Sequence, residues 1–135
     1  MFILDTNVVS ELRKGRNSQV GAWAATVPGH LMFLSVITVM ELETGILRLR
    51  RKDIAQAALL SEWFEQRVLP TFAERILPVD LAVARRCAKL HVPDPRSYRD
   101  ALIAATALES GLVVATRNTA DFKPTGVGVF NPWDA

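Results

Sequence analysis

The sequence predicts an α/β fold, a three-layer sandwich in which a central, mostly parallel sheet is flanked by helices. Short apolar runs alternate with segments of helical length along the whole chain, which is typical of this class. The runs are apolar throughout, as expected for parallel strands buried on both faces. No repeat or linker interrupts the 135 residues, so we expect a single domain over residues 1–135.

The expected elements of the first half follow one another with clear boundaries. Asp5 ends the first apolar run, Gly15 breaks the first helix, and Asn17 or Ser18 can cap the second helix. In order, we expect a strand over 2–4, a helix to about 13, a helix to 25, a strand over 31–35 and a helix over 37–51.

The second half carries stronger capping signals. Asp53 and Asp80 are favourable N-caps, and Gly111 suits the position just after a helix. Pro70 is expected to stop the long helix that Asp53 opens. In order, we expect a helix over 54–69, a strand over 76–79, helices over 81–91 and 97–110, a strand over 112–116 and a short strand within 126–133.

Composition excludes several classes of protein. Half of the residues are hydrophobic and 22% are charged, which is too apolar for a disordered chain. The single cysteine, Cys87, rules out an intramolecular disulfide and a thiolate metal cluster. No apolar run approaches the roughly 18–20 residues that cross a bilayer, and Asp5 comes too early for a signal peptide, so we expect a soluble cytoplasmic protein. The mean hydropathy of +0.17 is high for a small monomer and suggests a surface for a partner or for self-association.

Four carboxylates stand where ligands usually bind in such a fold, beyond the carboxyl ends of the strands. Asp5 and Asp121 follow strands, and Glu41 and Asp100 lie in early turns of helices. At 3.6 residues per turn, Asp100 shares a face with small apolar residues, so its carboxylate should point inward and need a partner. We therefore expect the four acids to meet at one edge of the sheet.

Each acid also has an ordinary structural explanation. Asp5 can cap the helix that follows it, and Asp121 can form an Asx turn. Asp100 can cap its own helix or pair with Arg99 or Arg96, and the glutamate can be satisfied by a polar neighbour on its helix. Taken together these explanations are weaker, because four independent acids would have to reach one edge by chance.

A cluster of these acids would require a cation. Two like charges about 4 Å apart repel by roughly 4 kcal/mol at an effective dielectric constant of 20. Ligation by oxygen alone suits Mg²⁺ or Mn²⁺, whereas His30 and His91 are isolated and show no zinc spacing. Such an ion completes its shell with water and phosphate oxygens, so phosphodiester hydrolysis is its natural chemistry.

Four blocks of the sequence resemble those of PIN-domain ribonucleases, in order and at the expected spacing. The ending over 128–133, GVFNPW, is typical of the VapC toxins within that family, particularly the FitB-like ones. The blocks are 3–11 (ILDTNVVSE), 35–45 (SVITVMELETG), 100–107 (DALIAATA) and 115–122 (ATRNTADF).

The resemblance implies a PIN-like fold and a Mg²⁺- or Mn²⁺-dependent endoribonuclease. It implies the toxin of a type II toxin–antitoxin system, neutralised by a cognate VapB-like antitoxin and forming a homodimer. By motif match, the four acids are both catalytic and metal-binding: Asp5, Glu41, Asp100 and Asp121. Thr6 and Asn118 are at positions that support such a site by hydrogen bonds.

Clusters of basic residues are candidates for holding RNA phosphates. Arg13 and Lys14 follow the first helix, and Arg48 and Arg51 lie two to three turns beyond the glutamate. A solvated basic helix end explains the second pair equally well, and ordinary solvent exposure explains the first pair equally well.

Two other functions compete with this interpretation. A haloacid-dehalogenase-like phosphatase also opens with an acid after the first strand, but it needs a second acid where Asn7 stands. A catalytically inactive PIN-fold module could bind nucleic acid or protein. The intact set of acids argues against it.

Overall fold

The computed structural model describes residues 1–135 and confirms the α/β fold class. Five strands form one sheet in the order β3-β2-β1-β4-β5, and every neighbouring pair is parallel. The central strand β1 places Leu4 opposite Ala115 of β4 and Ile3 opposite Phe33 of β2. The strands are β1 (Phe2–Leu4), β2 (Met32–Ser35), β3 (Ile76–Leu77), β4 (Val113–Ala115) and β5 (Val129–Phe130). Their carboxyl ends therefore share one edge.

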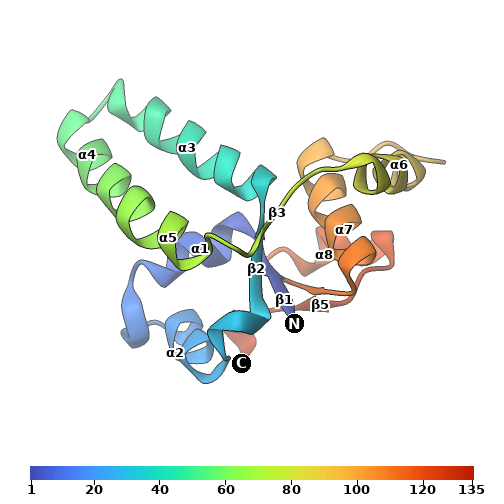
Figure 1. The fold of residues 1–135 in the computed structure, drawn as a ribbon, viewed down its shortest axis with the longest axis horizontal. Coiled ribbons are helices and arrows are strands. Elements are labelled where there is room, and N and C mark those ends of the chain that lie inside the picture. The colour runs from blue at the N-terminus through green and yellow to red at the C-terminus, as the bar shows by residue number, and fades with distance from the viewer.

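Helices occupy both sides of this sheet. In Figure 1, α3 and α4 lie together as an arm on one side, and α6 and α7 form a pair on the other. The helices are α1 (Thr6–Leu12), α2 (Gln19–Thr26), α3 (Val36–Arg50), α4 (Ile54–Trp63), α5 (Leu69–Thr71), α6 (Leu81–Leu90), α7 (Tyr98–Ser110) and α8 (Thr119–Phe122). Short 3₁₀ turns cover Gly15–Asn17, Gly29–Leu31, Lys123–Thr125 and Pro132–Asp134. None of the helices combines the length and apolar character needed to span a membrane.

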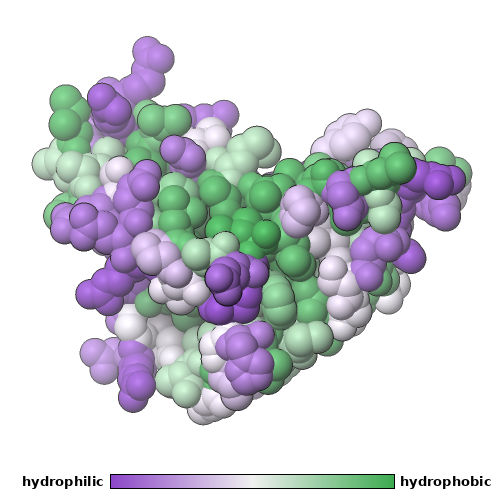
Figure 2. Space-filling view, in the orientation of Figure 1, coloured by the Kyte–Doolittle hydropathy of each residue, from purple (hydrophilic) through white to green (hydrophobic).

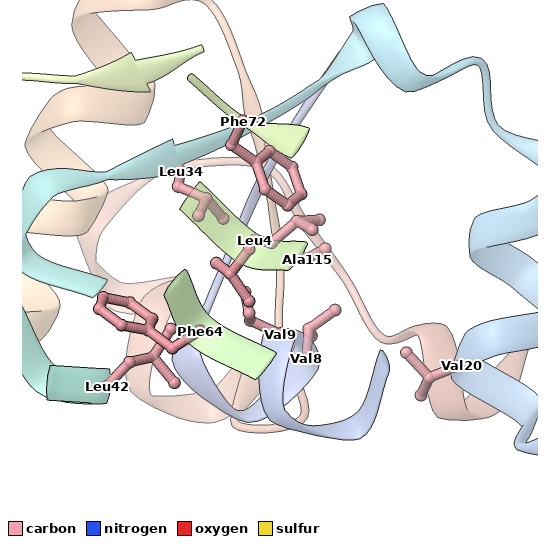
Figure 3. Packing of buried hydrophobic residues seen from close by; sticks show 10 residues of the cluster. Leu4, Val8, Val9, Val20, Leu34, Leu42, Phe64, Phe72 and Ala115 are labelled. Atoms are coloured by element: carbon pink, nitrogen blue, oxygen red, sulfur yellow. The ribbon is translucent and has the colours of Figure 1, made fainter. Parts of the chain in front are cut away.

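The core divides along the two faces of the sheet because successive strand residues point to opposite sides. Leu4 and Ala115 pack with residues of α1 to α4, and Phe64 fills the space beside Leu42 (Figure 3). Ile3 instead packs against the small residues of α7 on the other face. Both layers of helices are thus held by strand residues adjacent in sequence.

The expected caps are present. Ser18, Asp53 and Asp80 each accept a hydrogen bond from a backbone N–H in the first turn of α2, α4 and α6. Ser97 caps α7 in the same way, and Gly111 ends it in the left-handed conformation with φ of 67°. The start of α7 sets the position of Asp100, which lies in its first turn.

The helix opened by Asp53 differs from the expectation. It does not run as one α-helix to residue 69 and stop at Pro70. Instead α4 ends at Trp63, a π-helical turn covers Phe64–Val68, and α5 includes Pro70. Pro70 directly follows the π-helical turn, in which the N–H of Leu69 already bonds to the carbonyl of Phe64. The regular α-helical pattern that a proline interrupts has therefore ended before it. Strand β3 is also shorter than expected and ends at Leu77.

Candidate functional site

Asp5 is buried at the carboxyl end of the central strand, with 0% of its surface exposed. Its backbone N–H donates to the carbonyl of Ala115 over 2.9 Å. Its Oδ1 accepts from the N–H of Thr6 at 2.8 Å, and its Oδ2 accepts from the hydroxyl of Thr116 at 2.8 Å and from Nδ2 of Asn7 at 3.3 Å. Asp5 therefore caps α1, as the structural explanation proposed, and its carboxylate is held in one orientation.

Glu41 reaches the same place from α3. Its Oε1 accepts from the hydroxyl of Thr6 at 2.7 Å. Thr6 thus links the first turn of α1 to the second turn of α3 and fixes the glutamate beside Asp5. The supporting hydrogen bond expected of Thr6 is present in this geometry.

Asp100 enters from the first turn of α7. Burial raises the pKa of its carboxyl group, and the charges of Asp5 and Asp121 add to that rise, against the opposing effect of Arg99. Its Oδ1 accepts from Nη1 of Arg99 at 2.5 Å. The pairing with Arg99 considered from the sequence is therefore present, whereas Arg96 donates to the backbone carbonyl of Leu90.

Arg99 connects the acids of three different elements. Its Nε pairs with Oε2 of Glu41, and its Nη1 pairs with Asp100 and lies 3.8 Å from Oδ1 of Asp5. Burial alone would lower the pKa of the guanidinium, but the three carboxylates outweigh burial and raise that pKa above its ordinary value. Three of the four expected acids thus gather around one cationic group.

Asp121 stands at the margin of this cluster. It is exposed in α8 and forms no ion pair, although its charge contributes to the raised pKa of Asp100. Its backbone N–H donates to the carbonyl of Asn118 at 3.1 Å. Asn118 contacts the residues around Asp5 through its backbone N–H, which donates to the hydroxyl of Thr116 at 3.0 Å.

Sequence reasoning missed two of the residues that hold Asp5. Thr116 was read only as the end of an apolar strand, and Asn7 only as the residue that argues against a phosphatase. Both are polar side chains at the carboxyl edge of the sheet, and both lie inside motif blocks, so their position was the available signal. Asn7 donates to Asp5, where a phosphatase of the dehalogenase type would need a second acid.

The donor set suits a hard divalent cation, because carboxylate oxygens of Asp5, just after β1, and of acids on α3 and α7 surround a common positive group. With Arg99 among them, no three acidic, histidine or cysteine side chains are arranged to hold a metal ion. The three carboxylates share this one point, and the guanidinium of Arg99 occupies it.

The basic candidates differ in their distance from the acids. Arg48 shares a surface hollow with Glu41, one that Met40, Thr44 and Gly45 also line. Lys14 pairs with Glu11 at 2.8 Å, and Arg13 lines a separate hollow beside α4.

Similarity to known proteins extends over nearly the whole chain. A family model described as PIN domain matches residues 2–126. The chain is 43% identical to a protein named Toxin FitB from Neisseria gonorrhoeae, covering 98% of this chain and 99% of that one. It is 39% identical to a protein named VapC ribonuclease Y4jK from Sinorhizobium fredii, covering 99% of each. The crystal structure of FitAcB from Neisseria gonorrhoeae superposes with a TM-score of 0.90 at 40% identity over 100% of both chains.

Proposed function

Because the chain belongs to the PIN domain family, as its motif blocks predicted, we propose that it is an endoribonuclease toxin of a type II toxin–antitoxin module. It hydrolyses RNA phosphodiester bonds with Mg²⁺ or Mn²⁺. The observation that carries this proposal is the convergence of Asp5, Glu41 and Asp100 from separate elements on one point at the carboxyl edge of the sheet. Nearly full-length similarity to proteins named as a toxin and as a ribonuclease supports the same activity.

These three acids are the proposed cation ligands. A bound divalent cation supplies a polarised water and offsets the negative charge that develops on the phosphate. Thr116 and Asn7 keep the carboxylate of Asp5 pointed at the site, and Thr6 does the same for Glu41. Asp121, exposed beside Asp100, orients the attacking water.

The substrate and partners follow from the surface around the acids. Arg48 is the basic residue best placed to hold an RNA phosphate, because it lies in the same hollow as Glu41. Arg51 lies ten residues beyond Glu41, about 15 Å away at the helical rise per residue, and is more remote from the cleavage point. A cognate VapB-like antitoxin restrains the activity.

Self-association is proposed from exposed apolar residues. Large apolar side chains are exposed on α3, just before α6 and at its start, and hydrophobic surface is visible between the two helix pairs (Figure 2). They include Val36, Met40, Val79 and Leu81. Because exposed apolar area of this kind favours association, we propose a homodimer, and light scattering on the purified protein measures its mass.

The alternative of a catalytically inactive binding module draws on one observation. Arg99 already supplies a positive charge to the carboxylates, and a site filled permanently in this way would bind partners without cleaving RNA. Metal-dependent cleavage separates the two functions.

The experiment is cleavage of total cellular RNA with Mn²⁺ or with EDTA, using Asp5→Asn. We expect the wild-type protein to cleave with Mn²⁺ only, and Asp5→Asn to lose at least about 100-fold in rate, because the variant removes one charged ligand. Circular dichroism checks that the variant is folded.

Asp53→Asn is the matched control for that experiment. It makes the same chemical change at the N-cap of α4, where asparagine serves as well as aspartate. Cleavage by Asp53→Asn should equal that of the wild type. Undiminished cleavage by a pure preparation of Asp5→Asn contradicts the proposed site, and a folded wild type that never cleaves favours the binding module.

A further inference from the structure

We propose that Arg99 is a built-in competitor of the divalent cation and sets the cation concentration at which the acidic site fills. The inference rests on the proposed function, because it takes Asp5, Glu41 and Asp100 as the cation ligands. It adds a role for a residue that neither the motif blocks nor the family match assigns.

The competition follows from which oxygens Arg99 uses. It contacts Oε2 of Glu41 and Oδ1 of Asp100, and it lies 3.8 Å from Oδ1 of Asp5. The opposite oxygen of Glu41, Oε1, accepts from the hydroxyl of Thr6. On Asp5, Oδ2 accepts from the hydroxyl of Thr116, and Oδ1 accepts from the backbone N–H of Thr6. A cation that approaches Glu41 through Oε2 and Asp5 through Oδ1 therefore meets the guanidinium at the same point.

Charge favours an exchange between the two occupants. Arg99 brings a single positive charge to three carboxylates, so the cluster keeps a net negative charge that a divalent ion neutralises further. A guanidinium and a divalent cation within a few ångströms repel each other, and both cannot sit among the same oxygens. One occupant therefore excludes the other.

The position of Arg99 permits the exchange without unfolding. It lies in the first turn of α7, and 34% of its side chain is exposed. The long, flexible side chain can rotate toward solvent while the backbone of α7 keeps Asp100 in place. No other basic side chain pairs with Asp5, Glu41 or Asp100, so the competition is specific to this arginine.

The test is the affinity of the purified full chain for Mn²⁺, measured from the electron paramagnetic resonance signal of free Mn²⁺. Because the apparent affinity scales with the fraction of competent sites, a guanidinium that occupies the carboxylates nine-tenths of the time lowers affinity about tenfold. We expect Arg99→Gln to bind Mn²⁺ about tenfold more tightly than the wild type. Arg99→Lys keeps the positive charge but has fewer hydrogen-bond donors, so its affinity for Mn²⁺ should lie between those of the wild type and Arg99→Gln. This variant also tests the inference if Arg99→Gln does not fold.

Arg86→Gln is the matched control. It also removes one positive charge, but Arg86 pairs with Glu109 at 2.5 Å. Glu109 lies nine residues beyond Asp100 along α7, which is about 14 Å from it at the helical rise per residue. The affinity of Arg86→Gln should stay within about twofold of the wild type, since exposed charges at that distance are screened.

Several outcomes overturn the inference. Equal or weaker Mn²⁺ binding by folded Arg99→Gln means that Arg99 does not compete, and equal tightening in Arg86→Gln means that overall charge is responsible. If Arg99→Gln does not fold and Arg99→Lys binds no more tightly than the wild type, the inference also fails. Adding Asp5→Asn to the tighter variant should abolish binding. If the folded wild type and folded Arg99→Gln both fail to bind Mn²⁺, both the proposed metal site and the competition by Arg99 are wrong. If both bind Mn²⁺ with equal affinity, the metal site stands and only the competition is wrong.

Discussion

Thr116 determines how the buried carboxylate of Asp5 is held. Its hydroxyl donates to Oδ2 of Asp5 at 2.8 Å and accepts from the N–H of Asn118 at 3.0 Å, and both Thr116 and Asp5 are fully buried. Thr116→Val keeps the shape of the side chain and removes both bonds. Since water can replace the lost partner of exposed Asn118, the bond to the charged group dominates, and the free energy of unfolding should fall by about 2 kcal/mol.

The same substitution should weaken cation binding. The side-chain donor left on Oδ2 of Asp5 is Asn7, at the longer distance of 3.3 Å, so the carboxylate is less firmly oriented. Loss of a hydrogen-bonding partner behind a metal-binding carboxylate typically lowers affinity about 10–100-fold. Urea unfolding followed by circular dichroism gives the stability change, and titration with Mn²⁺ gives the Kd.

Thr106→Val is the control for Thr116→Val. Thr106 is 1% exposed, and its hydroxyl donates at 2.8 Å to the carbonyl of Leu102 one turn earlier in α7. Such a bond within a helix contributes little, so the stability change should stay below about 1 kcal/mol, with the Kd for Mn²⁺ unchanged. If Thr116→Val binds Mn²⁺ as tightly as Thr106→Val does, Thr116 does not orient Asp5 and the reasoning is wrong.

Two further substitutions test the fold and the pH response. A Cβ at Gly21 would lie 1.9 Å from the backbone oxygen of Gly15, whereas a Cβ at Gly45 meets open space. In urea unfolding, Gly21→Ala should be destabilised by more than about 2 kcal/mol and Gly45→Ala stabilised by about 0.5–1 kcal/mol. Similar stability changes in the two variants would refute the close packing at Gly21. Burial raises the pKa of the Cys87 thiol above its ordinary 9.0, so the folded chain keeps a proton that the unfolded chain loses. The contribution of the protonated thiol to the free energy of unfolding is complete below pH 9 and is lost as pH rises further. In urea unfolding from pH 8.5 to 10.5, the stability of Cys87→Ala should therefore fall less steeply with pH than that of the wild type. Equal dependence on pH in the two proteins would contradict the raised pKa of Cys87.

Local signals were enough to predict most of the framework. The apolar strand before Asp5 and the caps Ser18, Asp53 and Asp80 depend on residues within a few positions of each boundary. The π-helical turn near Pro70 could not be predicted, because it depends on how Phe64 and Val68 pack into the core beneath the sheet.

The sequence was enough to predict which acids form the site, but not which side chains they contact. Topology alone brings Asp5, Glu41 and Asp100 to one edge, because parallel strands end together. Arg99 was considered only as a neighbour of Asp100, since the reach of a long side chain to acids on β1 and α3 depends on tertiary packing. The marginal position of Asp121 likewise depends on the turn that starts α8.

The position of a bound cation tests the account most directly. Crystals grown with Mn²⁺ and measured at its absorption edge should give an anomalous peak about 2.0–2.6 Å from carboxylate oxygens of at least two of Asp5, Glu41 and Asp100. The same map should show Arg99 turned away from them. A map at saturating Mn²⁺ with no peak among these carboxylates, and with Arg99 still paired to Glu41 and Asp100, would contradict it.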